Sequence, residues 1–157
     1  METGGWIGKR NMVETAGKVL AVGSHLFRET FAPITRHRLA LYCAGSGDHN
    51  PIHVDIDFAK ASGYDDVFVH GMLVMAYLGS ALTHALPQSM LRSFNVRFVA
   101  VTPLLASITC EGTVSGVVEK LDERLLQVSL TARDGYEIKL SGDALVLLDP
   151  MQSASRS

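Results

Sequence analysis

One segment decides the fold: His70-Gly-Met-Leu-Val-Met-Ala-Tyr-Leu-Gly-Ser-Ala-Leu-Thr-His-Ala-Leu86. Wound at 3.6 residues per turn, its large apolar side chains fall on several sides of a helix over Met72–Leu86. These side chains are Leu73, Met75, Tyr77, Leu78 and Leu82. Pro87 ends the helix, because proline cannot continue one. A helix that is apolar on several sides is buried nearly all round, so the segment predicts one central helix enclosed by other structure.

After this helix the pattern of apolar residues changes from that of a helix to that of strands. Phe94, Val96 and Phe98 alternate with polar residues, which is the period of a half-buried strand. Further strands are predicted over residues 105–118, around 128–132 and over 136–148, with a tight turn at Asp134-Gly135 and a bulge at Gly142. An antiparallel sheet curved around one apolar helix satisfies this order, so the predicted fold class is α+β.

Upstream of the central helix, His25–Ala32 is predicted to form a strand. A helix over residues 36–44 follows, with Thr35 as its N-cap and Gly45-Ser-Gly47 as its end, and a short helix is expected over Asp55–Ser62. Residues 1–18 are expected to be a flexible segment or a short helix over 11–18. Residues 19–150 then make a single domain, and residues 151–157 a flexible tail.

Composition narrows the class of protein. The 157 residues are 47% hydrophobic and 19% charged, with a net charge of −2, which fits one globular domain. No basic surface is implied, so nucleic acid is not an expected partner. Neither a signal peptide nor a membrane span is evident, and Cys43 and Cys110 are expected to be reduced, buried thiols. These features predict a cytoplasmic protein.

The loop Ser46-Gly-Asp-His-Asn-Pro-Ile-His53 carries the candidate chemistry. Asp48 and His53 lie on either side of a turn set by Asn50-Pro51. A carboxylate and an imidazole can share a water, one accepting a proton while the other donates one, which suits addition of water to a carbon–carbon double bond. Taken singly, Asp48 also fits a residue that caps its own turn, and His53 fits a packed histidine.

This loop and three later segments resemble one family. Tyr42-Cys-Ala-Gly-Ser-Gly-Asp-His-Asn-Pro-Ile-His53 is followed by Phe58-Ala59, Val69-His-Gly-Met-Leu73 and Asn95-Val-Arg-Phe98. Together they resemble the MaoC-like dehydratases, which include (R)-specific enoyl-CoA hydratases and (3R)-hydroxyacyl-ACP dehydratase subunits. The likeness runs from about residue 25 to 148. It implies the hot-dog fold, in which a long sheet wraps a central helix.

The resemblance also implies roles for particular residues. Asp48 and His53 would be the catalytic pair, with their acid and base roles left open because coupled groups titrate together. The backbone N–H of Gly71 would bind the oxyanion. Three more residues are expected at the substrate: Asn50, His70 and Met72. Each has a plainer alternative, since Asn50 suits a turn, His70 suits packing before the helix and Met72 suits the core.

The expected activity is that of a hydro-lyase interconverting trans-2-enoyl-CoA and (R)-3-hydroxyacyl-CoA. Alternatives are a (3R)-hydroxyacyl-ACP dehydratase, a hot-dog thioesterase and a non-catalytic partner subunit. No metal is expected, since Pro51 keeps His49 and His53 off one helical face, and no cofactor is expected beyond the coenzyme A of the substrate. The expected assembly is a homodimer or higher oligomer, or a heteromer with a related subunit.

Overall fold

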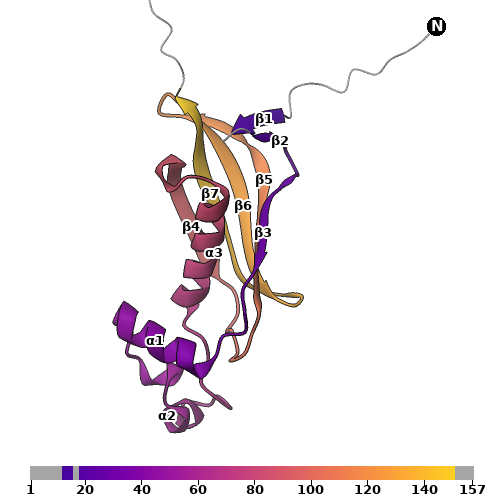
Figure 1. Ribbon diagram of the computed structural model, residues 1–157. Coiled ribbons are helices and arrows are strands. Elements are labelled where there is room, and N and C mark those ends of the chain that lie inside the picture. The colour runs from indigo at the N-terminus through magenta and orange to yellow at the C-terminus, as the bar shows by residue number, and fades with distance from the viewer. Residues whose placement is uncertain (1–11, 16–17, 151–157) are drawn as a thin grey trace, which may run out of the picture.

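A five-stranded antiparallel sheet curves around one helix in the computed structural model, which describes residues 12–15 and 18–150 (Figure 1). The strands of this sheet lie in the order β3-β5-β6-β7-β4. In chain order the elements are β1 (Met12–Thr15), β2 (Lys18–Ala21), β3 (His25–Thr30), α1 (Arg36–Ser46), η2 (Pro51–His53), α2 (Ile56–Ala61), α3 (Gly71–Ala85), η3 (Gln88–Met90), β4 (Leu91–Phe98), β5 (Ile108–Lys120), β6 (Glu123–Asp134) and β7 (Glu137–Pro150). The predicted α+β class and the hot-dog arrangement of sheet and helix are confirmed.

Helix α3 is the central helix that the apolar segment predicts. Its buried side chains are Leu73, Val74, Leu78, Ala81 and Leu82, which join the inward-facing residues of the sheet in one core. The other side is not enclosed, since Met72 is 50% exposed. The expectation of burial nearly all round is therefore wrong for a single chain, because one sheet can cover only the side of the helix that faces it.

The strands follow the period-two pattern that predicts them. In β5 and β6, alternate residues such as Ile108, Cys110, Val128 and Leu130 are fully or almost fully buried. Asp134-Gly135 forms the predicted turn between β6 and β7, with Gly135 at a φ of +56°.

Gly142 does not form the predicted bulge. It pairs in regular register with Val96 on one side and Leu130 on the other. A Cβ at this position would lie 2.0 Å from the backbone oxygen of Asn95. Glycine is therefore required by the close approach of β4 to β7 and not by an extra residue in the strand.

The N-terminal part of the described chain forms a two-stranded hairpin of β1 and β2, which lies near one end of the main sheet (Figure 1). The alternative of a short helix over residues 11–18 is therefore wrong for 12–15. Valine and threonine in this stretch favour extended backbone. Residues 1–11, 16–17 and the predicted tail 151–157 lie outside the described residues, and the domain boundaries stay a prediction.

Helices α1 and α2 lie beyond the opposite end of the sheet, next to the first turn of α3 (Figure 1). The hydroxyl of Thr35 accepts a hydrogen bond from the Arg38 N–H at 3.2 Å, which confirms the predicted N-cap. The helix continues through Gly45 and Ser46, two residues beyond the predicted end. It stops at Gly47, whose φ of +76° is left-handed and favours glycine. The candidate loop thus starts near the N-terminus of α3.

Residues 99–102, which follow β4, are tied to both neighbouring segments. The N–H of Val99 donates to the Lys139 carbonyl at 2.9 Å, and the Lys139 ammonium donates to the Val101 carbonyl at 2.9 Å. The N–H of Val69 donates to the Thr102 carbonyl at 2.9 Å. The Lys139 residue is only 2% exposed, and its charge is paired with Glu137 at 2.6 Å. This segment therefore links β7 to the strand-like connector that leads into α3.

Candidate active site

The loop after α1 is turned by its own polar side chains. The Ser46 hydroxyl accepts from the Asp48 N–H at 3.2 Å, and the Asp48 Oδ1 accepts from the Asn50 N–H at 3.3 Å. The Asn50 Oδ1 accepts from the Ile52 N–H at 3.1 Å and caps η2, in which Pro51 is the first residue. Asp48 does therefore cap its turn, as the plainer alternative holds. The residue is nevertheless exposed, so its carboxylate is also open to a ligand.

His53 is held in one orientation by a backbone contact. The residue is only 8% exposed, and its Nδ1 lies 2.8 Å from the carbonyl oxygen of Phe68. A carbonyl can only accept, so Nδ1 carries the proton and donates it. In the neutral ring the lone pair is then on Nε2. This tautomer leaves the Nε2 of His53 with a lone pair that is able to accept a proton.

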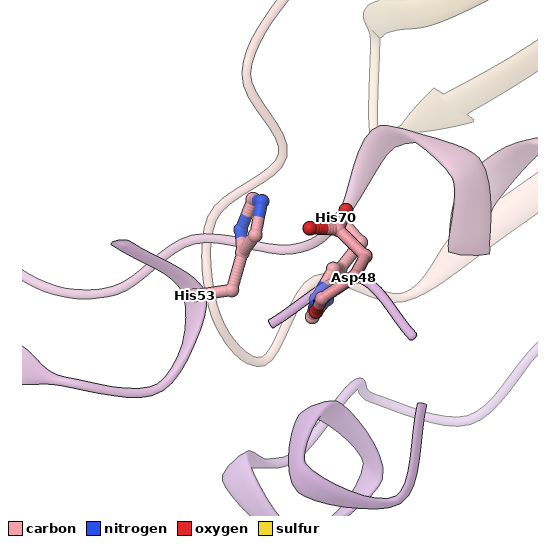
Figure 2. A group of neighbouring side chains, drawn as sticks. All are labelled: Asp48, His53 and His70. Carbon is pink, nitrogen blue, oxygen red and sulfur yellow. The ribbon is translucent and has the colours of Figure 1, made fainter. Parts of the chain in front are cut away.

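Asp48 and His53 face each other across a short gap (Figure 2). One side-chain ligand atom from each of Asp48, His53 and His70 lies within 4.8 Å of the other two. Two hydrogen bonds of about 2.8 Å, made at a tetrahedral angle by one water, span roughly 4.6 Å. The carboxylate and the imidazole are therefore close enough to hold one water between them.

His70 lies next to this pair on the buried side and has no exposed surface. Its ring stacks on His53 with centroids 3.9 Å apart and planes 28° apart, and its Nε2 lies 3.3 Å from the backbone oxygen of Asp48. The ring of Tyr42 meets it edge-on at 5.0 Å. Burial, and then the nearby His53, hold the pKa of His70 below its ordinary value. His70 is therefore a neutral ring in contact with both members of the pair.

The N-terminus of α3 completes the site. Gly71 is the first residue of this helix, and the preceding His70 makes no side-chain capping bond. Early helical N–H groups without a cap are free to bind a partial negative charge, and the helix dipole favours it there. The Phe98 ring lies 2.8 Å from the place that a Cβ on Gly71 would occupy. Only glycine leaves this corner open while Phe98 stays in place.

An apolar groove of about 310 Å³ opens at Gly71. Its walls come from the connector before α3, the start of α3 and the segment that follows β4. The lining residues are Phe68, Val69, Gly71, Val74, Phe98, Val99, Ala100, Val101, Thr102 and Leu140. Neither Asp48 nor His53 lines it, and Gly71 and Phe68 connect the groove to the pair. The groove thus offers an apolar surface that begins at Gly71, next to the pair.

Comparison with known families matches residues 18–134 to the MaoC like domain. The chain belongs to the MaoC-like family. Its sequence is 24% identical over 117 residues to an (R)-specific enoyl-CoA hydratase of Rhodospirillum rubrum, covering 73% of this chain and 80% of that protein. It is 35% identical over 65 residues to the 3-hydroxyacyl-thioester dehydratase X of Mycobacterium tuberculosis, which is 41% of this chain but 22% of that protein.

Solved structures of similar fold include enzymes and complexes. R-hydratase PhaJ1 from Pseudomonas aeruginosa superposes with a TM-score of 0.68 at 26% identity, over 83% of each chain. A chain of the ChsH1-ChsH2 complex from Mycobacterium tuberculosis superposes with a TM-score of 0.70, over 82% of this chain and 98% of that one. Its identity of 18% shows the fold alone. The relatives of this MaoC-like domain described above include an (R)-specific enoyl-CoA hydratase, an R-hydratase and a 3-hydroxyacyl-thioester dehydratase.

The remaining predicted residues of the MaoC-like domain occupy different settings. Asn50 is exposed, and its side-chain oxygen is used to cap η2. Met72 is 50% exposed beside Gly71, so the alternative that it belongs to the core is wrong. Cys43 and Cys110 are both free, as expected, although Cys43 is only half-buried. None of the helices among the described residues is long and apolar enough to cross a membrane.

Two contributors to the site escape prediction from the sequence. The Phe68 carbonyl fixes the His53 ring, but a backbone group leaves no signal in residue type. Tyr42 is part of the resembling segment, yet its contact with His70 depends on how α1 meets α3. Burial, and then the charge of Asp48, raise the pKa of Tyr42 above its ordinary value. Tyr42 therefore stays a neutral phenol near the carboxylate.

Asp48, His53 and His70 also form a set of donors that resembles a metal site in residue type. Their geometry is less suited to a metal. Histidine binds a metal through the lone pair in its ring plane, and the planes of His53 and His70 are stacked only 28° apart. Lone pairs in nearly parallel, stacked planes do not converge on one ion. The stacking of the two rings therefore does not suit a metal centre.

Proposed function

We propose that this MaoC-like domain is a hydro-lyase that interconverts trans-2-enoyl-CoA and (R)-3-hydroxyacyl-CoA. One observation carries the proposal: the Asp48 carboxylate and the His53 imidazole converge within 4.8 Å beside an uncapped helix N-terminus. The family membership and the hydratase and dehydratase relatives support the same reaction class. Coenzyme A enters as part of the substrate, and the reaction needs no other cofactor.

The proposed chemistry adds the two parts of water to the double bond. Asp48 and His53 hold the water, and one of them takes its proton as the oxygen attacks C3. A proton from the pair then reaches C2, so that both groups return to their starting state. Negative charge builds on the thioester oxygen between these events. The Gly71 N–H donates a hydrogen bond to that oxygen, where a preorganised donor is worth about 10²–10³ in rate.

Asn50, Met72 and the groove give the substrate its surroundings in this proposal. Met72 is exposed next to Gly71, so its flexible side chain is able to contact the acyl or pantetheine part of a thioester. Asn50 lies between the two catalytic residues, with its amide nitrogen available for a polar group of the substrate. The groove beyond Gly71 receives apolar chain.

The test is a direct hydration assay on the purified protein. Crotonyl-CoA and longer trans-2-enoyl-CoA thioesters are supplied, and loss of the conjugated double bond is followed together with chiral analysis of the product. Formation of the (R)-3-hydroxyacyl-CoA supports the proposal. Release of free coenzyme A without hydration would instead indicate a thioesterase, and no reaction with any thioester would indicate a non-catalytic subunit.

A second candidate is the same reaction in the dehydration direction, on a carrier-protein thioester. The similarity to the 3-hydroxyacyl-thioester dehydratase X favours it, because that name describes loss of water from a thioester. Matched CoA and carrier-protein thioesters of one (R)-3-hydroxy acid separate the two. Turnover confined to the carrier-protein thioester would favour the second candidate.

A further inference from the structure

We propose that His70 is a positioning residue for the Asp48–His53 pair and does not bind substrate itself. The inference rests on the proposed function, since it assigns His70 a part in the same reaction. His70 joins the three parts of the site. It stacks on the ring of His53, it contacts the backbone of Asp48, and it is the residue from which α3 and Gly71 begin.

The contact with Asp48 fixes the tautomer of His70. The backbone oxygen of Asp48 only accepts hydrogen bonds, so the Nε2 of His70 must carry the proton that it donates over 3.3 Å. The Nδ1 is buried and has no hydrogen-bond partner among the described residues. A proton on Nδ1 would thus be a buried donor without an acceptor, which is unfavourable, and more so for a charged group. His70 is therefore kept neutral, with its proton on Nε2.

A neutral ring at this place serves the pair in two ways. It gives the His53 ring a flat surface 3.9 Å away, while the Phe68 carbonyl holds the edge of the same ring. The titratable groups that face His70 are Tyr42, Asp48 and His53, and a second positive charge among them would compete with a protonated His53. His70 also anchors Asp48 through its main chain, so this contact does not occupy the carboxylate.

Full burial separates this role from substrate binding. The 0% exposure of His70 leaves no surface for a thioester to touch, whereas Asp48 and Met72 are open. A residue that acts through its neighbours should affect the rate of the bound complex more than its formation. We therefore expect changes at His70 to lower kcat and to leave KM within about threefold.

Two amide variants test the contact with Asp48. In His70→Gln the amide nitrogen falls near the position of the ring Nε2, while in His70→Asn it falls near Nδ1. We expect His70→Asn to lower kcat by roughly 10–100-fold, the range seen when a residue that orients a metal-binding side chain is lost, and His70→Gln to recover at least about fivefold of that loss. Circular dichroism and Tm are measured for both, since a merely structural role would give both amides the same rate.

Nitrogen-15 NMR of the histidine rings adds a readout that does not require turnover. In the wild type at pH 7 we expect a neutral His70 with its proton on Nε2 and a His53 with its proton on Nδ1. A charged His70, a proton on Nδ1 of His70, equal kcat in both amides, or a rise in KM alone would overturn the inference.

The two proposals fail in different ways. An active wild type with an unaffected His70→Asn variant overturns the role of His70 alone. A wild type that hydrates no thioester, but shows the expected tautomers, overturns the proposed reaction and leaves the ring arrangement confirmed.

Discussion

At the scale of the residue, the proposed function gives Asp48 two separable roles. Its Oδ1 accepts the Asn50 N–H and holds the turn, while its charge would serve the proposed reaction. Asp48→Asn keeps an oxygen for the turn and removes the charge. We expect turnover of enoyl-CoA to fall by roughly 10²-fold or more with little change in Tm, and His53→Ala to have a similar effect on turnover.

Asp122→Asn is the matched control for Asp48→Asn. This residue lies in the exposed turn between β5 and β6, with a φ of +60° that asparagine accepts readily. The control also removes one negative charge, so it should keep full activity. Hydration by Asp48→Asn within about threefold of the wild type would contradict the assignment of Asp48.

The two thiols should differ in reactivity. Burial, and then the charge of Glu29, raise the pKa of Cys110 to about 12, while Cys43 is half-buried. At pH 8 about one in 10⁴ molecules would carry the Cys110 thiolate, and the thiolate is the reactive form. We expect a disulfide reagent to modify one thiol in the native protein and two after denaturation. Rapid modification of both native thiols would show that Cys110 is accessible.

At the scale of the element, glycine matters most where two strands crowd each other. Gly142→Ala would place a Cβ 2.0 Å from the Asn95 carbonyl, and a backbone atom in a sheet cannot move aside cheaply. We expect a loss of at least about 2 kcal/mol in unfolding free energy, or a Tm lower by roughly 5 °C or more. Thermal and urea unfolding measure it.

Gly45→Ala provides the opposite case within the same chain. Gly45 lies inside α1, and a Cβ there would meet no atom within 4 Å. Alanine should therefore raise stability by about 0.5–1 kcal/mol, because glycine is costly in a helix. If both variants lost stability equally, the close approach of β4 and β7 would not be the cause of the effect at Gly142.

The elements could be predicted where one local pattern decides them. The alternation in Phe94–Phe98 and the cap at Thr35 are signals within a few residues, and both are confirmed. The C-terminal end of α1 lies two residues beyond the predicted one, because Gly45 is tolerated in a helix whose next residues still form hydrogen bonds. The bulge predicted at Gly142 is wrong because a sequence does not reveal how closely a neighbouring strand approaches.

In the candidate site, too, the sequence predicts individual residues but not the contacts between distant ones. Asp48, His53 and Gly71 follow from the loop, the helix start and the family resemblance. The stacking of His53 on His70 joins residues 17 positions apart, with α2 and a loop between them. No periodicity reports such a contact, so the arrangement of the rings and the Phe68 carbonyl had to come from the structure.

At the scale of the whole molecule, the uncovered surfaces favour self-association. Strand β4 is an edge of the sheet, and Met72 and Phe98 near its end are half exposed. Open edges and apolar faces are commonly covered by a second copy. We expect light scattering to give about 34 kDa, which is twice 17.0 kDa, at micromolar concentration. A mass of 17.0 kDa at every concentration would contradict a homodimer.

Lys139 offers a chemical probe of residues 99–102, which line one side of the groove. Its amino group is enclosed and tied to the Val101 carbonyl, so reagents that acylate amines should spare it while they label exposed lysines such as Lys60. Labelling of Lys139 would then occur only in molecules in which residues 99–102 have separated from β7. Mass spectrometry of the peptide that contains Lys139, with and without a bound thioester, would measure the fraction of molecules in which residues 99–102 have separated from β7.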